Sequence, residues 1–246
     1  MAAHAVPPAA SFLPAPSAAG PGFVVSGRFA ALLNRWVGEI AAVEGESCLD
    51  GRPTGIALPF VGQPVQGFSG IETWARDRCR LLIDNGFGSE TNSADALLSF
   101  HEVAIDWRSG RVRREKSVFL HDPDKVIPFR IVNEFTEERY LTGADLDVES
   151  IQTVGDLHWI GDEFGPYLIA ADRNGEVVAF FATELDGRVV RSPDHHAIGT
   201  PATPGPVRFE TRRSRGFEGM AACPEGRFLY ALLGASISSI RRRSRR

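Results

Sequence analysis

The chain has 246 residues, of which 43% are hydrophobic and 24% charged, and its formal net charge is −4. The apolar content excludes a disordered chain, and 3 Cys are too few for a disulfide scaffold. No apolar run is long enough to span a membrane, and the charge balance gives no reason to expect a nucleic-acid partner, so we expect a globular protein of one large or two small domains.

Residues 1–22 are rich in Ala and Pro and carry no charged side chain. This composition predicts a flexible leader outside the core. It lacks the basic start and continuous apolar stretch of a secretory signal. Residues 23–48 are ambiguous, because Phe29, Leu32 and Trp36 fit helical spacing whereas Val24 and Val25 fit a strand.

From Gly55 onward the pattern predicts β-structure. Short apolar runs such as 80–83 and 157–160 recur between Gly, Asp, Asn and Pro turns. Residues 106–110 (DWRSG) and 172–175 (DRNG) have the composition of hairpin turns. We therefore expect strands on both sides of each turn.

A short internal repeat occurs three times in this β-region. Its copies are residues 67–71 (GFSGI), 147–151 (DVESI) and 216–220 (GFEGM), and each precedes an apolar strand at 81–84, 157–162 or 228–233. The first copy also carries an insertion at residues 89–96. A recurring β-unit is typical of a propeller, whose blades cannot bury their faces alone. A β-sandwich is the alternative, but it would not explain three equivalent segments, so we predict an all-β, β-propeller-like fold.

The charge is unevenly distributed along the chain. The tail, residues 241–246, holds five Arg, which leaves a net of −9 for the rest. Between Asp122 and Glu163 eleven acidic residues face only three basic ones. Such a cluster either attracts a hard cation or forms a solvated face.

If the repeat copies are the innermost strands of blades, Ser69, Glu149 and Glu218 converge on one axis. Asp145, Asp147 and Glu149 are spaced by two, so on an extended strand they share one face. Oxygen ligands of this kind suit calcium better than zinc. Alternatively, these acids accept hydrogen bonds from turn amides. His195 and His196 follow a Ser-Pro-Asp segment without a third ligand in spacing, which favours a solvated loop.

At these motifs the sequence resembles the phytase-like family, also described as the esterase-like activity of phytase domain. The resemblance covers roughly residues 60–233, and the matching stretches are 67–70 (GFSG), 84–88 (DNGFG), 92–95 (NSAD), 122–125 (DPDK), 127–129 (IPF), 132–134 (VNE), 141–145 (LTGAD), 147–150 (DVES), 159–167 (WIGDEFGPY), 192–194 (SPD) and 214–220 (SRGFEGM). The resemblance implies a β-propeller-like fold, hydrolysis of phosphate esters, and export to the periplasm or the medium of a bacterium.

The chain departs from this family at its C-terminal end. The family usually continues past the strand at 229–233, often with an acidic residue where Gly234 stands. We therefore expect a phytase-like domain over residues 23–234 that is incomplete at its C-terminus. Residues 235–246 are expected to be a basic tail, either a frame-shifted or truncated reading or a disordered segment that binds anions.

Our leading hypothesis is an exported ester hydrolase assisted by a divalent cation such as calcium, and we favour small phosphate esters over carboxylic esters as its substrates. The expected catalytic residues are Glu149, Asp162, Glu163 and Glu218, and the expected metal ligands are Asp84, Asp145, Asp147 and Glu149. Arg215 and Lys125 are expected to bind the phosphate. The alternative is a non-catalytic propeller with structural calcium that serves as a binding or scaffold module.

Overall fold

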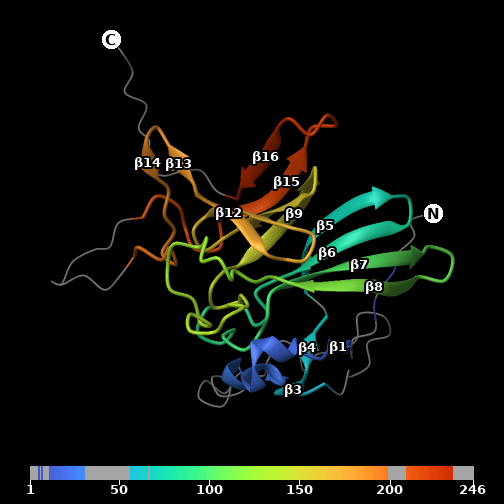
Figure 1. Cartoon of the computed structure of the whole chain (residues 1–246). Coiled ribbons are helices and arrows are strands. Elements are labelled where there is room, and N and C mark those ends of the chain that lie inside the picture. Colours follow the sequence, from blue (N-terminus) through green and yellow to red (C-terminus); the bar gives the residue numbers. More distant parts are fainter. Residues whose placement is uncertain are drawn as a thin grey trace, which may run out of the picture.

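The computed structural model describes residues 11–30, 56–65, 67–198 and 209–234, together with residues 5 and 7. Two antiparallel four-stranded sheets dominate these ranges (Figure 1). Their strands follow chain order, β5 (Phe68–Ala75), β6 (Arg78–Ile83), β7 (Ser99–Asp106) and β8 (Arg111–Phe119) in the first sheet, and β9 (Val148–Val154), β10 (Leu157–Asp162), β11 (Tyr167–Ala171) and β12 (Val177–Ala182) in the second. The all-β class and both predicted hairpins are therefore confirmed.

The remaining described strands form two-stranded antiparallel pairs. The largest pair joins β15 (Phe217–Ala222) to β16 (Leu229–Leu233). The smaller pairs join β1 (Phe12–Leu13) to β4 (Gln63–Pro64), β2 (Val25–Ser26) to β3 (Phe60–Val61), and β13 (Glu184–Leu185) to β14 (Arg188–Val189). Two 3₁₀ turns, η1 (Ser17–Ala19) and η2 (Pro21–Phe23), lie near the N-terminus.

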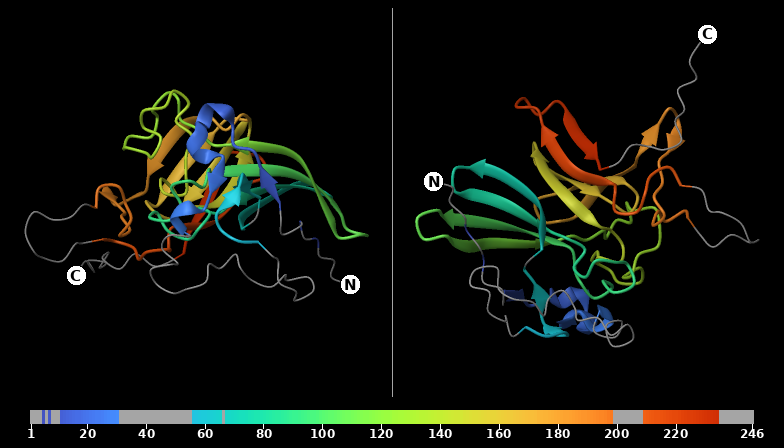
Figure 2. Two further views of the ribbon diagram at one scale, coloured as in Figure 1. Left: turned by 90° about the horizontal axis from the view of Figure 1, so that it is seen from below. Right: turned by 180° about the vertical axis from the view of Figure 1, so that it is seen from behind.

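The three copies of the sequence repeat are the first strands of three successive units, β5, β9 and β15. Strand β9 lies between the other two and contacts both (Figures 1 and 2). Strands β5 and β9 run in the same direction, since Glu149 lies beside Ser69 and Thr153 lies beside Glu72. No sheet in the described part of the chain closes into a ring.

The main core lies between the two four-stranded sheets. Leu82 and Phe100 from the first sheet pack in one cluster with Ile151 and Ile160 from the second. Side chains alternate between the two faces of a strand. Because Ile151 and Ile160 point into this core, their neighbours in β9 and β10 point away from it. The sheets are thereby held so that the starts of β5 and β9 come together.

The described part of the expected flexible leader packs against the fold. Ala19 and Phe23 are buried with Leu97, and the Gln63 side-chain amide donates a hydrogen bond of 2.9 Å to the Phe23 carbonyl. Strand β1 of this segment also pairs with β4, a contact between distant parts of the sequence. Residues 31–48 of the ambiguous segment and the expected tail, residues 235–246, lie outside the described residues.

Candidate functional site

A β-bulge recurs at the same place in all three units. The pairing register shifts between Phe68 and Gly70 in β5 and between Phe217 and Gly219 in β15. In the second unit it shifts at the end of β10, where Asp162 pairs with Val148 and Gly161 with Ser150. The extra residues are therefore Ser69, Glu149 and Glu218. A bulge redirects the side chain of its extra residue and is common beside active sites.

These bulge residues are brought together. The Ser69 side chain donates a hydrogen bond to the Glu149 carboxylate, and the negative charge of Glu218 acts on Glu149 from the other side. The inner strands of the three units thus direct polar side chains into one shared space, as the repeat predicts.

A second set of equivalent positions lies at the end of the second strand of each unit. The backbone N–H groups of Asp84, Glu163 and Gly234 each donate a 2.8 Å hydrogen bond to the residue that precedes the first strand of their own unit. A Cβ atom at Gly234 would lie 2.6 Å from Glu218 Oε1, so this position faces the same space. The third unit lacks the carboxylate that the first two supply here.

Three carboxylates of this space have the arrangement of a cation site. Oxygen atoms of Asp84, Asp147 and Glu149 all lie within 4.8 Å of one another. The Oδ1 atom of Asp147 is buried and has no hydrogen-bond partner. A buried carboxylate oxygen without a donor is costly unless a proton or a cation satisfies it. The donors are all oxygen atoms, which suit a hard cation.

The electrostatics of this group point the same way. Burial, with the charge of Asp84, raises the pKa of Glu149 to about 7. Burial and the neighbouring Asp84 also raise the pKa of Asp147 well above its ordinary value. Like charges at this separation cannot all ionise without a counter-charge, so the group holds protons or a cation.

Glu163 and Glu218 form a carboxylate pair beside this group. Burial and a hydrogen bond to Glu218 raise the pKa of Glu163. The pair therefore retains a proton near neutral pH. Arg215 Nη1 lies 3.9 Å from Glu218 Oε1, and its side chain is half exposed at the edge of the site. A guanidinium in this place can approach a bound anion from the solvent side.

Asp162 lies beneath the site and is fully buried. Its Oδ1 accepts a 2.7 Å hydrogen bond from the Asp147 N–H, and its Oδ2 accepts one of 2.7 Å from the Gly165 N–H. Burial raises its pKa to about 7. This carboxylate holds the segments that carry Asp147 and Glu163, so its contacts favour positioning over the predicted catalytic role.

Two predicted residues lie away from the three-carboxylate group. Asp145 precedes β9, and its carboxylate accepts hydrogen bonds from the Val132 N–H and from the Thr142 N–H and hydroxyl. The prediction that Asp145 shares a strand face with Asp147 and Glu149 is corrected, because the chain turns at residues 143–145 and extends only from Val148. Lys125 lies near Glu134, with 3.8 Å between Nζ and Oε1, and is mostly exposed.

An adjacent cavity of about 260 Å³ contains residues that the sequence reasoning missed. It is lined by Phe164, next to Glu163 in the chain, and by Glu90, Phe129, Arg130, Ala144, Asp145, Tyr167, Asp194 and His196. Burial and the charge of Asp194 raise the pKa of Glu90 to about 7. Glu90 belongs to the insertion at residues 89–96. Because the second copy of the repeat lacks this insertion, its presence was a sequence feature that could have pointed to Glu90.

The two histidines beside this cavity differ: His195 corrects the prediction of a solvated loop, whereas His196 is exposed in a turn, as predicted. His195 is 4% exposed, and its ring lies 5.3 Å from that of Tyr167. The His196 ring stacks on Phe129 at 4.6 Å, and the hydrogen bond between its Nδ1 and the Tyr167 hydroxyl is 2.6 Å long. Aromatic packing removes the His195 imidazole from solvent, whereas His196 stays exposed although its ring stacks on Phe129.

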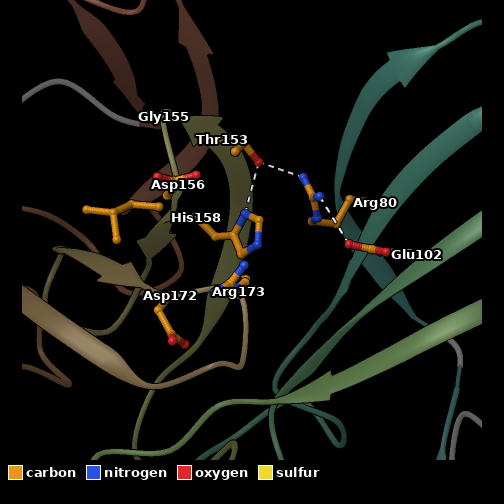
Figure 3. A pocket seen from close by; sticks show the side chains of 9 residues that line it. Arg80, Glu102, Thr153, Gly155, Asp156, His158, Asp172 and Arg173 are labelled. Carbon is orange, nitrogen blue, oxygen red and sulfur yellow. Dashed lines mark hydrogen bonds and ion pairs between the residues drawn. The ribbon is translucent and has the colours of Figure 1, made fainter.

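A cavity of about 360 Å³ between the two large sheets has a different character (Figure 3). The Arg80 guanidinium donates a 2.6 Å hydrogen bond to Thr153 Oγ1 and pairs with Glu102 at 3.2 Å. Thr153 Oγ1 also lies 2.9 Å from Nδ1 of His158. Burial and Arg80 lower the pKa of His158 to about 4, so its imidazole is neutral. The bond between Arg80 and Thr153 joins the two sheets, while Arg80 Nε is buried without a hydrogen-bond partner.

The fold and the site define an all-β protein with a partly buried group of carboxylates where repeated units meet. The family described as "Phytase-like: Esterase-like activity of phytase" matches residues 63–243. The chain belongs to this family. Comparison with curated proteins and with solved structures finds no match.

Two statements follow from this membership and the described residues. The family suggests hydrolysis of phosphate esters, and hence a phosphate ester as substrate. In the described part of the chain, no helix is both long enough and apolar enough to cross a membrane.

Proposed function

We propose that this protein hydrolyses phosphate esters at the carboxylate site between its repeated units, with the help of a divalent cation. The observation that carries the proposal is the group formed by Asp84, Asp147 and Glu149, in which a buried Asp147 oxygen has no hydrogen-bond partner. Family membership supports the choice of phosphate esters.

The proposal includes a propeller-like arrangement of the units. Two four-stranded meanders with adjacent first strands and a third unit that begins in the same way support it. The bulge shared by Ser69, Glu149 and Glu218 supports it further, because equivalent bulges are expected in blades of one origin. In such an arrangement the bulge residues line the central channel.

The residues present fit a hard divalent cation, and we propose calcium. Asp84, Asp147 and Glu149 would hold it, since carboxylate oxygens at flexible spacing are ligands that calcium prefers. When bound, such a cation neutralises phosphoryl charge and lowers the pKa of a water molecule. It would also offset the mutual repulsion that raises the pKa of Glu149.

The chain's own residues supply the proton chemistry and the binding of substrate. Burial and the hydrogen bond to Glu218 raise the pKa of Glu163, so Glu163 keeps its proton near neutral pH and can donate it to the oxygen of the leaving alkoxide, which departs as the alcohol. Arg215 lies at the edge of the site and can bind a phosphate oxygen. The cavity beside Phe164 can receive the alcohol part of the ester, since it combines aromatic walls with Glu90 and Asp194.

The proposal is tested by measuring turnover of a phosphate monoester, a phosphodiester and a carboxylic ester, each with calcium and with a chelator. Glu149→Gln and Glu218→Gln are expected to abolish calcium-dependent turnover. Glu225→Gln removes an exposed carboxylate from the turn between β15 and β16 and serves as the matched control. Undiminished phosphate-ester turnover in both site variants would overturn the proposal.

The same measurements address the non-catalytic alternative. A large calcium-dependent rise in melting temperature without turnover of any ester would favour a binding or scaffold module with structural calcium. Export to the periplasm or the medium is a further part of the proposal, suggested by the family. Fractionation of cells that produce the full-length gene product tests it, and a product found only in the cytoplasm would contradict it.

A further inference from the structure

A basic groove lies at the end of the first sheet that is remote from the carboxylates. It is formed by the β5–β6 turn and the β7–β8 turn, which lie side by side in Figures 1 and 2. The Trp107 indole N–H donates a 3.2 Å hydrogen bond to the Arg76 carbonyl and joins the two turns. The groove has a volume of about 710 Å³, and its lining residues include five arginines, Arg76, Arg78, Arg108, Arg111 and Arg113.

The floor of the groove is set by strand register. Arg78 pairs with Ala104, and Ala104 pairs with Arg113, so two arginines flank a small residue on one face of the sheet. Both guanidiniums contact the Glu115 carboxylate. The single negative charge of this carboxylate therefore lies between the two arginines and offsets part of their positive charge.

The other three arginines of the groove carry unbalanced charge. Arg76, Arg108 and Arg111 are exposed and form no ion pair with any residue in the described ranges. The Asp106 carboxylate is held within its own turn, where it accepts hydrogen bonds of 3.0 Å from the Arg108 N–H and 2.6 Å from the Ser109 hydroxyl. Asp77 is the other acidic residue of the lining, so the groove is net positive.

The groove is separate from the proposed hydrolytic site. Strand β5 runs from Ser69, beside Glu149, to the turn that carries Arg76. At the rise of an extended strand, these ends are roughly 20 Å apart. A small ester bound at the carboxylates cannot reach the groove, so the groove is a second, separate site.

We propose that this groove binds clustered phosphate groups, either on a free polyphosphate or on the headgroups of an anionic lipid surface. The planar guanidinium offers paired N–H donors that match two phosphate oxygens. Three guanidiniums without an ion pair lie in this groove, so a ligand with several phosphate groups fits it better than a ligand with one. The Trp107 ring, 42% exposed between the two turns, adds a surface that can lie against a sugar, an alcohol or a lipid interface.

The test compares two triple variants with the same change in charge. Arg76→Gln/Arg108→Gln/Arg111→Gln removes the unpaired charges of the groove. The matched control removes three exposed arginines elsewhere, as Arg188→Gln/Arg212→Gln/Arg227→Gln. Because the replaced side chains are exposed, both variants are expected to keep the melting temperature of the native chain.

Binding is measured in chelator, so that calcium at the carboxylates cannot capture phosphate. One arm uses inorganic tripolyphosphate in isothermal titration calorimetry, and the other uses co-sedimentation with phosphatidylglycerol vesicles against phosphatidylcholine vesicles. The groove variant is expected to bind at least about tenfold more weakly, since each basic residue near a phosphate surface contributes about a factor of five. The control variant is expected to bind like the native chain.

Each outcome decides the proposal. Selective loss in the tripolyphosphate arm supports a soluble ligand, and selective loss in the vesicle arm supports a lipid headgroup. The proposal is overturned if neither probe binds, or if both variants lose binding equally. It is also overturned if the protein binds a DNA duplex and neither of the two probes. Hydrolysis at the carboxylate site is measured separately, so failure of either proposal is recognised without the other.

Discussion

Replacing Glu149 by glutamine is expected to stabilise the cation-free protein at pH 8 and to change its stability much less at pH 5. The Ser69 hydroxyl donates a hydrogen bond to this side chain, and the oxygen of a glutamine can accept the same bond. The substitution therefore removes the negative charge and preserves the local geometry.

The size of the effect follows from the pKa of this carboxyl. Burial and the charge of Asp84 raise the pKa of Glu149 from 4.5 to about 7. The folded state thus holds the proton more tightly than the unfolded state, so stability is greatest below pH 4.5 and is lost as the pH rises from 4.5 through 7. The upper limit of this loss is about 3.4 kcal/mol, and solvent screening of a partly exposed group reduces it to about 2 kcal/mol.

Thermal unfolding followed by circular dichroism, with a chelator present, measures this effect. A difference of about 2 kcal/mol in a chain of this length corresponds to a rise of roughly 4 to 8 °C in melting temperature at pH 8. Glu225→Gln is the control and is expected to melt like the native chain at both pH values. The reasoning fails if the gain from Glu149→Gln does not grow between pH 5 and pH 8.

Three further predictions concern the same site. Glu163→Gln removes the proposed proton donor, so it is expected to lower kcat for phosphate esters by about 100-fold and to remove the alkaline limb of the pH profile of kcat. An unchanged pH profile in steady-state assays would contradict this role. Asp162→Ala is expected to cost about 3 kcal/mol in urea unfolding because the N–H groups of Asp147 and Gly165 lose their acceptor; a loss below about 1 kcal/mol would count against it. Calcium at a hundred times its Kd is expected to stabilise the native chain by about 2.7 kcal/mol. In calorimetric melting the Asp147→Asn variant is expected to lose most of this gain, and an equal gain in both proteins would place the cation elsewhere.

The hairpins were predictable because each depends on a few adjacent residues. The turns at 106–110 and 172–175 contain their own signals and lie between strands in the structure. The repeat was predictable for a related reason, since equivalent strands preserve equivalent apolar and small residues. The burial of His195 was not predictable, because the ring of Tyr167 that packs beside it belongs to β11, an element of its own at a distance in the sequence.

The carboxylate site was predictable only in part. Spacing by two suggested that Asp145 acts with Asp147 and Glu149, but a turn removes Asp145 and gives its carboxylate to the amides of Val132 and Thr142. Spacing describes one continuous strand and carries no information on where that strand begins. The bulge at Glu149 was equally hidden, because a bulge is a property of two paired strands.

The sequence by itself determined the all-β class, the three equivalent units, and an excess of acid along one part of the chain. These features are local, because each depends only on composition or on short periodic patterns of the sequence. Only the tertiary structure decided which acids meet, because Asp84 reaches Asp147 and Glu149 through the packing of two sheets against a common core. It likewise decided that the arginines of two separate turns line one groove, since strand register placed those turns side by side.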